Sequence, residues 1–229
     1  INLNTSSYDL IIRTTHEKEF QASIISSTIS DSKINIPELV IDKTGSKIEL
    51  TAKSKNSVII NPFVWDIDIE VFIPEEYIGN LNINGSSSDI SIADMQFKEL
   101  NIDVSSGDID INNTKWDSSK IDLSSGDVNI SDFEGKLDIK GSSGDIELNV
   151  NKLIGDISVD VSSGEIDLVL PSNSSFAIEA STKSGDIDLG IPITIFGKQK
   201  DNYIKGSYGN SNDMKTITLS VSSGDIEIQ

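Results

Sequence analysis

The sequence predicts an all-β fold, a single-stranded right-handed β-helix with rungs of about 19 residues, and three observations support this prediction. The first is a phrase close to Ser-Ser-Gly-Asp that returns along the chain, with its glycine at Gly107, Gly126, Gly144, Gly164, Gly185 and Gly224. The gaps between these glycines are 19, 18, 20, 21 and 39 residues. A repeat near this length over six copies is the signature of a solenoid.

The second observation is a set of apolar columns at fixed offsets from that glycine. Two residues after it stand Ile109, Val128, Ile146, Ile166, Ile187 and Ile226, and four after it the side chains are again Ile or Leu. Five residues before it stand Ile102, Ile121, Ile139, Val159, Ala180 and Leu219, and the column seven before it is broken only by Ser119. A spacing of two is the period of a strand with one buried face.

The third observation is the phrase itself, which reads as a sharp corner between two strands. Glycine tolerates positive φ, and Ser and Asp side chains can bond nearby backbone N–H groups. A meander of hairpins is the alternative, but identical residues at a constant period favour in-register parallel stacking of successive coils. Parallel crossovers favour right-handed winding. Two or three sheets per coil both fit the pattern.

The connection between copies supplies one large apolar side chain in most rungs. These residues are Phe97, Trp116, Phe133, Leu153 and Phe176. Aromatic residues in such a repeat usually serve as core, so we expect them to close the third side of the coil.

The whole chain, 1–229, reads as one β-solenoid domain. Residues 81–189 form the regular rungs and 217–229 the last rung, while 1–80 form an irregular or capping β region that is also rich in strand patterns. Residues 6–12 read as a degenerate first copy. The segment 190–216 is a loop or an insertion, which accounts for the double gap of 39 residues, and it is a candidate cover for the end of the coil.

Charge and composition exclude several classes of function. The chain has 37 acidic and 18 basic residues and a formal charge of −19, with Arg13 as its single arginine. Nucleic acid is excluded as a partner because phosphate binding needs clustered Lys and Arg. Cysteine is absent, so neither disulfides nor thiolate metal sites form. No apolar run is long enough for a membrane span. The start at Ile1 reads as a form whose export segment has been removed.

Three stretches carry a resemblance to a known family: IDIEVFIPEEY at 67–77, IDLVLPSNSSF at 166–176, and the closing KGSYGN…TITLSVSSGDIEI. Together with the Ser-Gly-Asp-Ile repeats they resemble the bacterial SGDI-type β-strand-repeat proteins of unknown function, which are catalogued as adhesins. The resemblance covers nearly the whole chain. It implies a β-helix-like fold and an extracytoplasmic place at the cell surface or envelope, and it brings no catalytic or binding residues.

An acidic column follows the corner glycine and allows two interpretations. Its members are Asp89, Asp108, Asp127, Asp145, Glu165, Asp186 and Asp225. In a parallel stack they lie about 4.8 Å apart, so their repulsion must be compensated. Either each carboxylate accepts backbone N–H groups at the corner, or Asp108, Asp127, Asp145, Glu165 and Asp186 form a ladder of cation sites, with calcium the natural ion for oxygen ligands. No other cofactor is indicated.

A second column lies between the two inward apolar positions and should point outward. It contains Asp110, Asn129, Glu147, Asp167, Asp188 and Glu227. The two columns together form an acidic stripe, which is either a solvated face that resists aggregation or a docking surface for a basic partner. Asp110, Glu147 and Asp167 are the candidate contact residues.

The segment 190–216 offers another candidate patch, with Phe196, Tyr203 and Tyr208 among lysines, because loops on rigid scaffolds often carry function. An enzyme is not predicted. The Ser pairs have no base near them, since the single histidine, His16, is distant in sequence. The predicted role is a non-catalytic module that binds an envelope or host protein, a cationic peptide or a glycan. A self-associating scaffold is the first alternative, and a polysaccharide-acting enzyme is the second.

Overall fold

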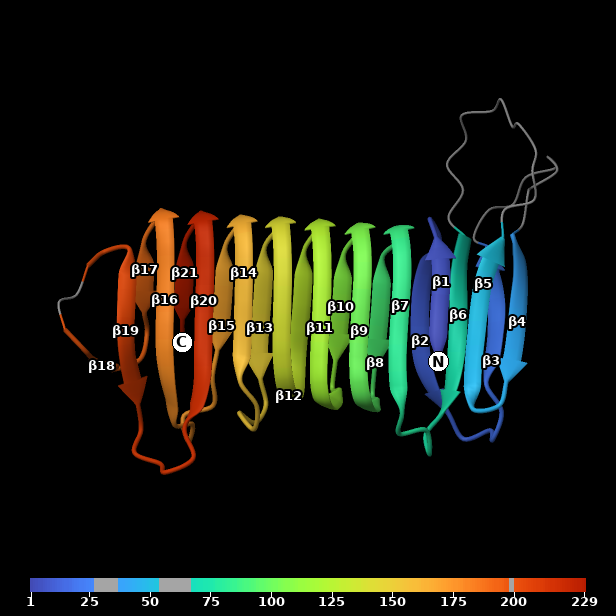
Figure 1. Ribbon diagram of the computed structural model, residues 1–229, viewed down its shortest axis with the longest axis horizontal. Coiled ribbons are helices and arrows are strands. Elements are labelled where there is room, and N and C mark those ends of the chain that lie inside the picture. The colour runs from blue at the N-terminus through green and yellow to red at the C-terminus, as the bar shows by residue number, and fades with distance from the viewer. Residues whose placement is uncertain (27–36, 54–66, 198–199) are drawn as a thin grey trace.

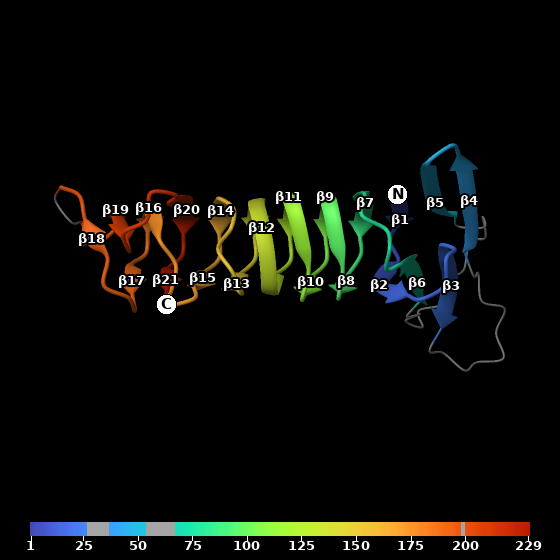
Figure 2. The same cartoon turned by 90° about the horizontal axis from the view of Figure 1, so that it is seen from below.

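The computed structural model describes residues 1–26, 37–53, 67–197 and 200–229, and it confirms the all-β class. These residues form 21 strands and no helix. The strands make two layers along one long axis (Figures 1 and 2). We name the layers sheet A and sheet B, and the long strand β12 (Val128–Ser143) takes part in both.

Sheet A consists of twelve strands that neighbour one another in an order different from their order in the chain. From the end near the N-terminus these are β4 (Glu38–Thr44), β5 (Lys47–Lys53), β1 (Asn2–Ser6), β7 (Asn80–Ser87), β9 (Gln96–Ser106), β11 (Lys115–Ser125), β12, β14 (Ile157–Ser163), β20 (Lys215–Ser223), β16 (Phe176–Ser184), β19 (Tyr203–Tyr208) and β18 (Thr194–Ile195).

Sheet B follows the same plan. Its strands in spatial order are β3 (Gln21–Ser26), β6 (Ile67–Pro74), β2 (Asp9–Thr15), β8 (Ile90–Ala93), β10 (Ile109–Asn112), β12, β13 (Ile146–Val150), β15 (Ile166–Val169), β21 (Ile226–Ile228) and β17 (Ile187–Leu189).

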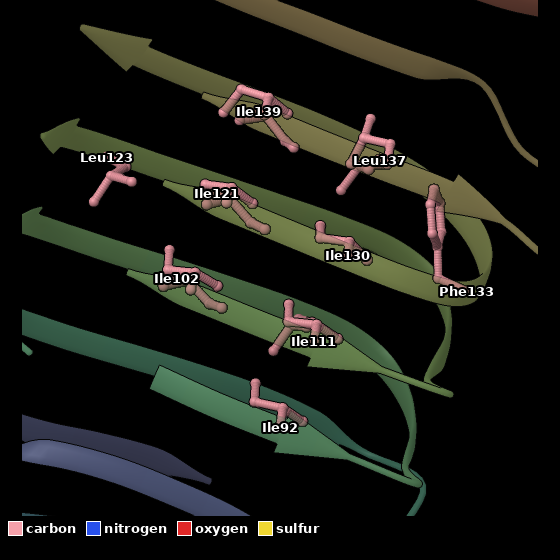
Figure 3. Close-up of a cluster of buried hydrophobic side chains, with 14 of the residues drawn as sticks. Ile92, Ile102, Ile111, Ile121, Leu123, Ile130, Phe133, Leu137 and Ile139 are labelled. Atoms are coloured by element: carbon pink, nitrogen blue, oxygen red, sulfur yellow. The ribbon is translucent and has the colours of Figure 1, made fainter. Parts of the chain in front are cut away.

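The apolar columns pair in register, as their constant offsets predict. In sheet A, Ile102, Ile121 and Ile139 are successive partners in parallel strands. In sheet B, Ile109, Val128 and Ile146 are successive partners. All of these side chains are buried, and Figure 3 shows residues of both sheets gathered in the space between them. The core is therefore one continuous apolar layer between two sheets.

The last copy in sequence is not the last copy in space. Strand β20 pairs with β14 on one side and β16 on the other, and β21 lies between β15 and β17. Residues 217–229, which the sequence places as the terminal rung, therefore lie inside the stack. Residues 170–175 lead from β15 to β16 and leave the place between β14 and β16 for β20, which residues 209–214 reach from β19.

In the N-terminal region, too, the spatial order of the strands differs from their order in the chain. Strand β1 lies between β5 and β7, and β2 lies between β6 and β8, in parallel register on both sides. Four strands within 1–80 thus belong to regular parallel layers, and the degenerate copy at 6–12 contributes to them. The irregular part is smaller than the sequence indicates and consists, among the described residues, of β3 and β4.

Antiparallel strands lie at both ends of sheet A and at the N-terminal end of sheet B, whereas β17 at the other end of sheet B pairs in parallel with β21. Strand β3 pairs antiparallel with β6, and β4 with β5. At the other end β19 pairs antiparallel with β16, and β18 with β19. Within 190–216, β18 and β19 thus extend sheet A beyond β16.

The corner requires glycine for two reasons. Gly144 has φ of +137°, a conformation that side chains rarely adopt, and a Cβ built on it would lie 1.8 Å from the carbonyl oxygen of Gly126. The corners of neighbouring copies pack backbone to backbone, so the repeated phrase is architectural.

The connection residues close the side of the core, as expected. Phe97, Trp116, Phe133 and Phe176 are buried, and Leu153 packs against them half-buried. The Trp116 and Phe133 rings stack with centroids 5.5 Å apart, and the Trp116 Nε1–H donates to the Lys136 carbonyl at 2.9 Å.

Candidate functional site

The acidic column after the corner is a hydrogen-bonded ladder. The backbone N–H of Asp108 donates to Oδ1 of Asp89 at 2.9 Å, and the N–H of Asp127 donates to Oδ1 of Asp108 at 2.9 Å. The same contact, at 2.8–2.9 Å, joins Asp145 to Asp127, Glu165 to Asp145, Asp186 to Asp225 and Asp89 to Asp9. The carboxylates that accept these bonds, those of Asp9, Asp89, Asp108, Asp127, Asp145 and Asp225, thus offset part of the repulsion through a hydrogen bond from a backbone N–H of the neighbouring copy.

In each of these contacts one carboxylate oxygen, Oδ1, is engaged in a hydrogen bond within the fold. Across the ranges that the structure describes, no group of three or more His, Asp or Glu side chains is placed to hold a metal ion. The calcium interpretation of Asp108, Asp127, Asp145, Glu165 and Asp186 therefore gains no coordinating group from this geometry.

The second column forms the outer surface of sheet B. In spatial order its members are Asp110, Asn129, Glu147, Asp167, Glu227 and Asp188. The inserted strand β21 places Glu227 between Asp167 and Asp188, so four carboxylates from Glu147 to Asp188 follow one another without interruption. We call this column of sheet B, together with the corner column that directly precedes its strands, the acidic face.

Asp167 lies where the acidic face is most crowded. Partial burial, then the nearby carboxylates of Glu227 and Asp145, raise its pKa above the usual value. A raised carboxyl pKa in the folded state means that folding is penalised once the pH rises above the unfolded value near 3.9.

Asp167→Asn is therefore expected to stabilise the protein at pH 7 and to lose this advantage as the pH falls. The wild-type carboxyl becomes protonated in both states below the unfolded pKa, so the two proteins should converge there. Urea unfolding at pH 7 and at pH 3 measures the difference. A gap that widens on acidification would contradict the assignment.

The outer surface of sheet A differs in chemistry. Lys120 forms an ion pair with Asp122, and Lys140 is the register partner of Asp122 on the next strand. The Asn101 side-chain amide donates to Oδ1 of Asn82 at 2.9 Å. Amides and lysines thus interrupt the acidic residues on this side, and the uninterrupted acidic surface belongs to sheet B.

The aromatic residues of 190–216 do not form one patch. The Tyr203 hydroxyl donates to Glu179 Oε1 at 3.0 Å, on the outer surface. Tyr208, five positions later on the same strand, faces the other way and stacks on Phe176 with centroids 5.5 Å apart. Phe196 is 55% exposed. Two of the three thus hold β19 to β16.

Sequence reasoning missed a cavity of about 700 Å³ at the N-terminal end. It is bordered by the connection 15–20 after β2, by the β4–β5 hairpin and by 74–77 after β6. His16 is here, with Nδ1 3.0 Å from Oε2 of Glu75. The sequence does show the two short connections that border the cavity, THEKEF at 15–20 and PEEY at 74–77, each ending in an aromatic residue. That these two connections lie close together follows only from the spatial order of the strands.

These features define a class: all-β repeat proteins with two in-register parallel layers and one acidic outer surface. The chain belongs to the Toastrack DUF4097 family, which matches residues 1–229. A solved structure described as a putative cell adhesion protein from Clostridium sporogenes ATCC 15579 is similar, with 17% identity, 99% of this chain and 90% of that chain covered, and a TM-score of 0.35. No curated protein matches. No helix in the described ranges is long and apolar enough to cross a membrane.

Proposed function

We propose that the chain is a non-catalytic binding module of the bacterial cell surface or envelope, in which a rigid right-handed β-helix presents its acidic face to a cationic protein or peptide. The observation that carries this proposal is the uninterrupted run of carboxylates on sheet B. Support for the winding comes from Figure 1, where β7, β9, β11 and β14 in front point up, the sheet B strands behind them point down, and the copies from β7 to β16 advance away from the N-terminal end. The extracytoplasmic location rests on the family resemblance.

A rigid scaffold makes such a surface effective. Asp110, Glu147, Asp167 and Glu227 are on strands that pair on both sides, so little backbone freedom is lost when a partner binds. Complementary charge accelerates encounter and favours the correct partner more than it adds affinity. The proposed partner is therefore basic, and its binding should weaken with salt.

Neutralising three residues of the acidic face tests the proposal. The variant Asp110→Asn, Glu147→Gln, Asp167→Asn should bind a fluorescent deca-lysine peptide about tenfold more weakly, because three exposed contacts contribute about 0.5 kcal/mol each. Fluorescence anisotropy at low and moderate salt measures the affinity.

The matched control removes the same charge from sheet A through Asp103→Asn, Asp138→Asn and Asp160→Asn. It should change the affinity by less than about twofold. Equal losses in the two triple variants would show that net charge alone attracts the peptide, and the proposed docking surface would then be wrong.

The self-associating scaffold is less well supported. It requires strand edges at both ends of the stack that another molecule can extend in the parallel register of the repeat. Among the described strands only β17, at one end of sheet B, is such an edge, since β3, β4 and β18 end the sheets in antiparallel pairings.

A further inference from the structure

The cavity at the N-terminal end has the dimensions and the walls of a ligand site. Its volume of about 700 Å³ lies within the range of small-molecule pockets. Phe20, Ile48 and Tyr77 are half-buried against the core and line it, and Ile41 borders it with 47% of its surface exposed. Three separate segments of the chain contribute these side chains.

The cavity lies where the column of connection residues is interrupted. Ile78 occupies the position in its copy that Phe97 occupies in the next copy. Each lies two residues before a member of the register pair Asn80 and Glu99. Phe97 is 1% exposed and fills the side of the core, but Ile78 is 63% exposed and turns outward. Tyr77, the residue before Ile78, instead packs half-buried against the core and lines the cavity.

Charge at the rim favours a positive group. The carboxylates of Glu17, Glu19, Glu75 and Glu76 border the cavity, against the ammonium groups of Lys18 and Lys43. His16 is paired with Glu75. The α-amino group of Ile1 also borders the cavity but donates to the Tyr77 hydroxyl at 3.1 Å and to the Asn80 carbonyl at 2.8 Å.

We propose that this cavity binds an aromatic or alkyl group that carries an ammonium ion. The apolar part lies beside Phe20, Ile48 and Tyr77, which line the cavity. The ammonium lies at the rim, where carboxylates are in excess and aromatic faces attract cations. The site is independent of the acidic face and goes beyond the proposed function.

Three probes of similar shape separate the contributions of charge and apolar surface: 4-phenylbutylamine, 4-phenylbutanol and 4-phenylbutyrate. Titrations of the full chain followed by ¹H–¹⁵N spectra should show saturable binding of the amine with a dissociation constant below about 1 mM, at least about fivefold tighter than the alcohol. The shifts should concentrate at 15–20 and 74–77. Similar affinity for all three probes, or no saturation by the amine, would overturn the proposal.

Variants locate the site. Glu17→Gln with Glu76→Gln should weaken amine binding several-fold and leave the alcohol unchanged, while Ile41→Ser, at an exposed position that the fold tolerates, should weaken both. The matched control, Glu147→Gln with Asp167→Asn on the acidic face, should leave amine binding unchanged. If the control weakens it and the cavity variants do not, the amine binds the acidic face and the cavity proposal fails.

Discussion

Gly144→Ala is expected to destabilise the protein by about 3 kcal/mol or more, although only one methyl group is added. Its φ of +137° disfavours any side chain. The new Cβ would lie 1.8 Å from the backbone oxygen of Gly126. That oxygen cannot move away freely, because Gly126 is packed in the same manner on Gly107. Urea unfolding monitored by circular dichroism measures the loss.

Gly45→Ala is the matched control for this prediction. Gly45 also has positive φ, +62°, but nothing lies within 4 Å of its Cβ position. The cost should therefore be the conformational part alone, about 1 kcal/mol. If the two substitutions cost the same, the backbone contact between neighbouring corners is not what requires glycine.

A disulfide between Ser158→Cys and Thr218→Cys is expected to form and to stabilise the protein by about 4 kcal/mol. The two positions are register partners on β14 and β20, and adjacent strands lie about 4.8 Å apart, within the range that a disulfide spans. The bond would close a loop of about 60 residues and so restrict the unfolded chain. The chain has no native cysteine to interfere. Non-reducing electrophoresis and thermal unfolding provide the measurements.

The control pair is Ser158→Cys with Glu179→Cys. Stacking in sequence order would make these two positions neighbours, but Glu179 pairs with Thr218, so β20 separates it from Ser158. Two strand spacings, about 9.6 Å, exceed what a disulfide bridges. Oxidation of this pair, with failure of the 158–218 pair, would disprove the insertion of the last copy.

Much of the candidate site could be predicted from the sequence, because it depends on local geometry. Alternation along a strand places Asp110, Glu147 and Asp167 outward once the apolar positions are turned inward. The need to compensate stacked carboxylates predicts that they accept backbone protons. Only the three-dimensional stacking shows that the donating N–H group belongs to the neighbouring copy. Tyr203 and Tyr208 were grouped by their nearness in sequence, but an odd separation on a strand places them on opposite sides.

By itself, the sequence determined the corner, the buried columns and the all-β class, since each depends on a residue type at a fixed offset within one copy. The tertiary structure alone decided the order of the copies, the four consecutive carboxylates from Glu147 to Asp188 and the cavity near Tyr77. The physical reason is that all copies offer nearly the same edge of N–H and C=O groups and the same apolar columns. Local pairing therefore distinguishes weakly among neighbours. The order depends on the connections and on the antiparallel strands at both ends, whose effects appear only when the whole chain is packed.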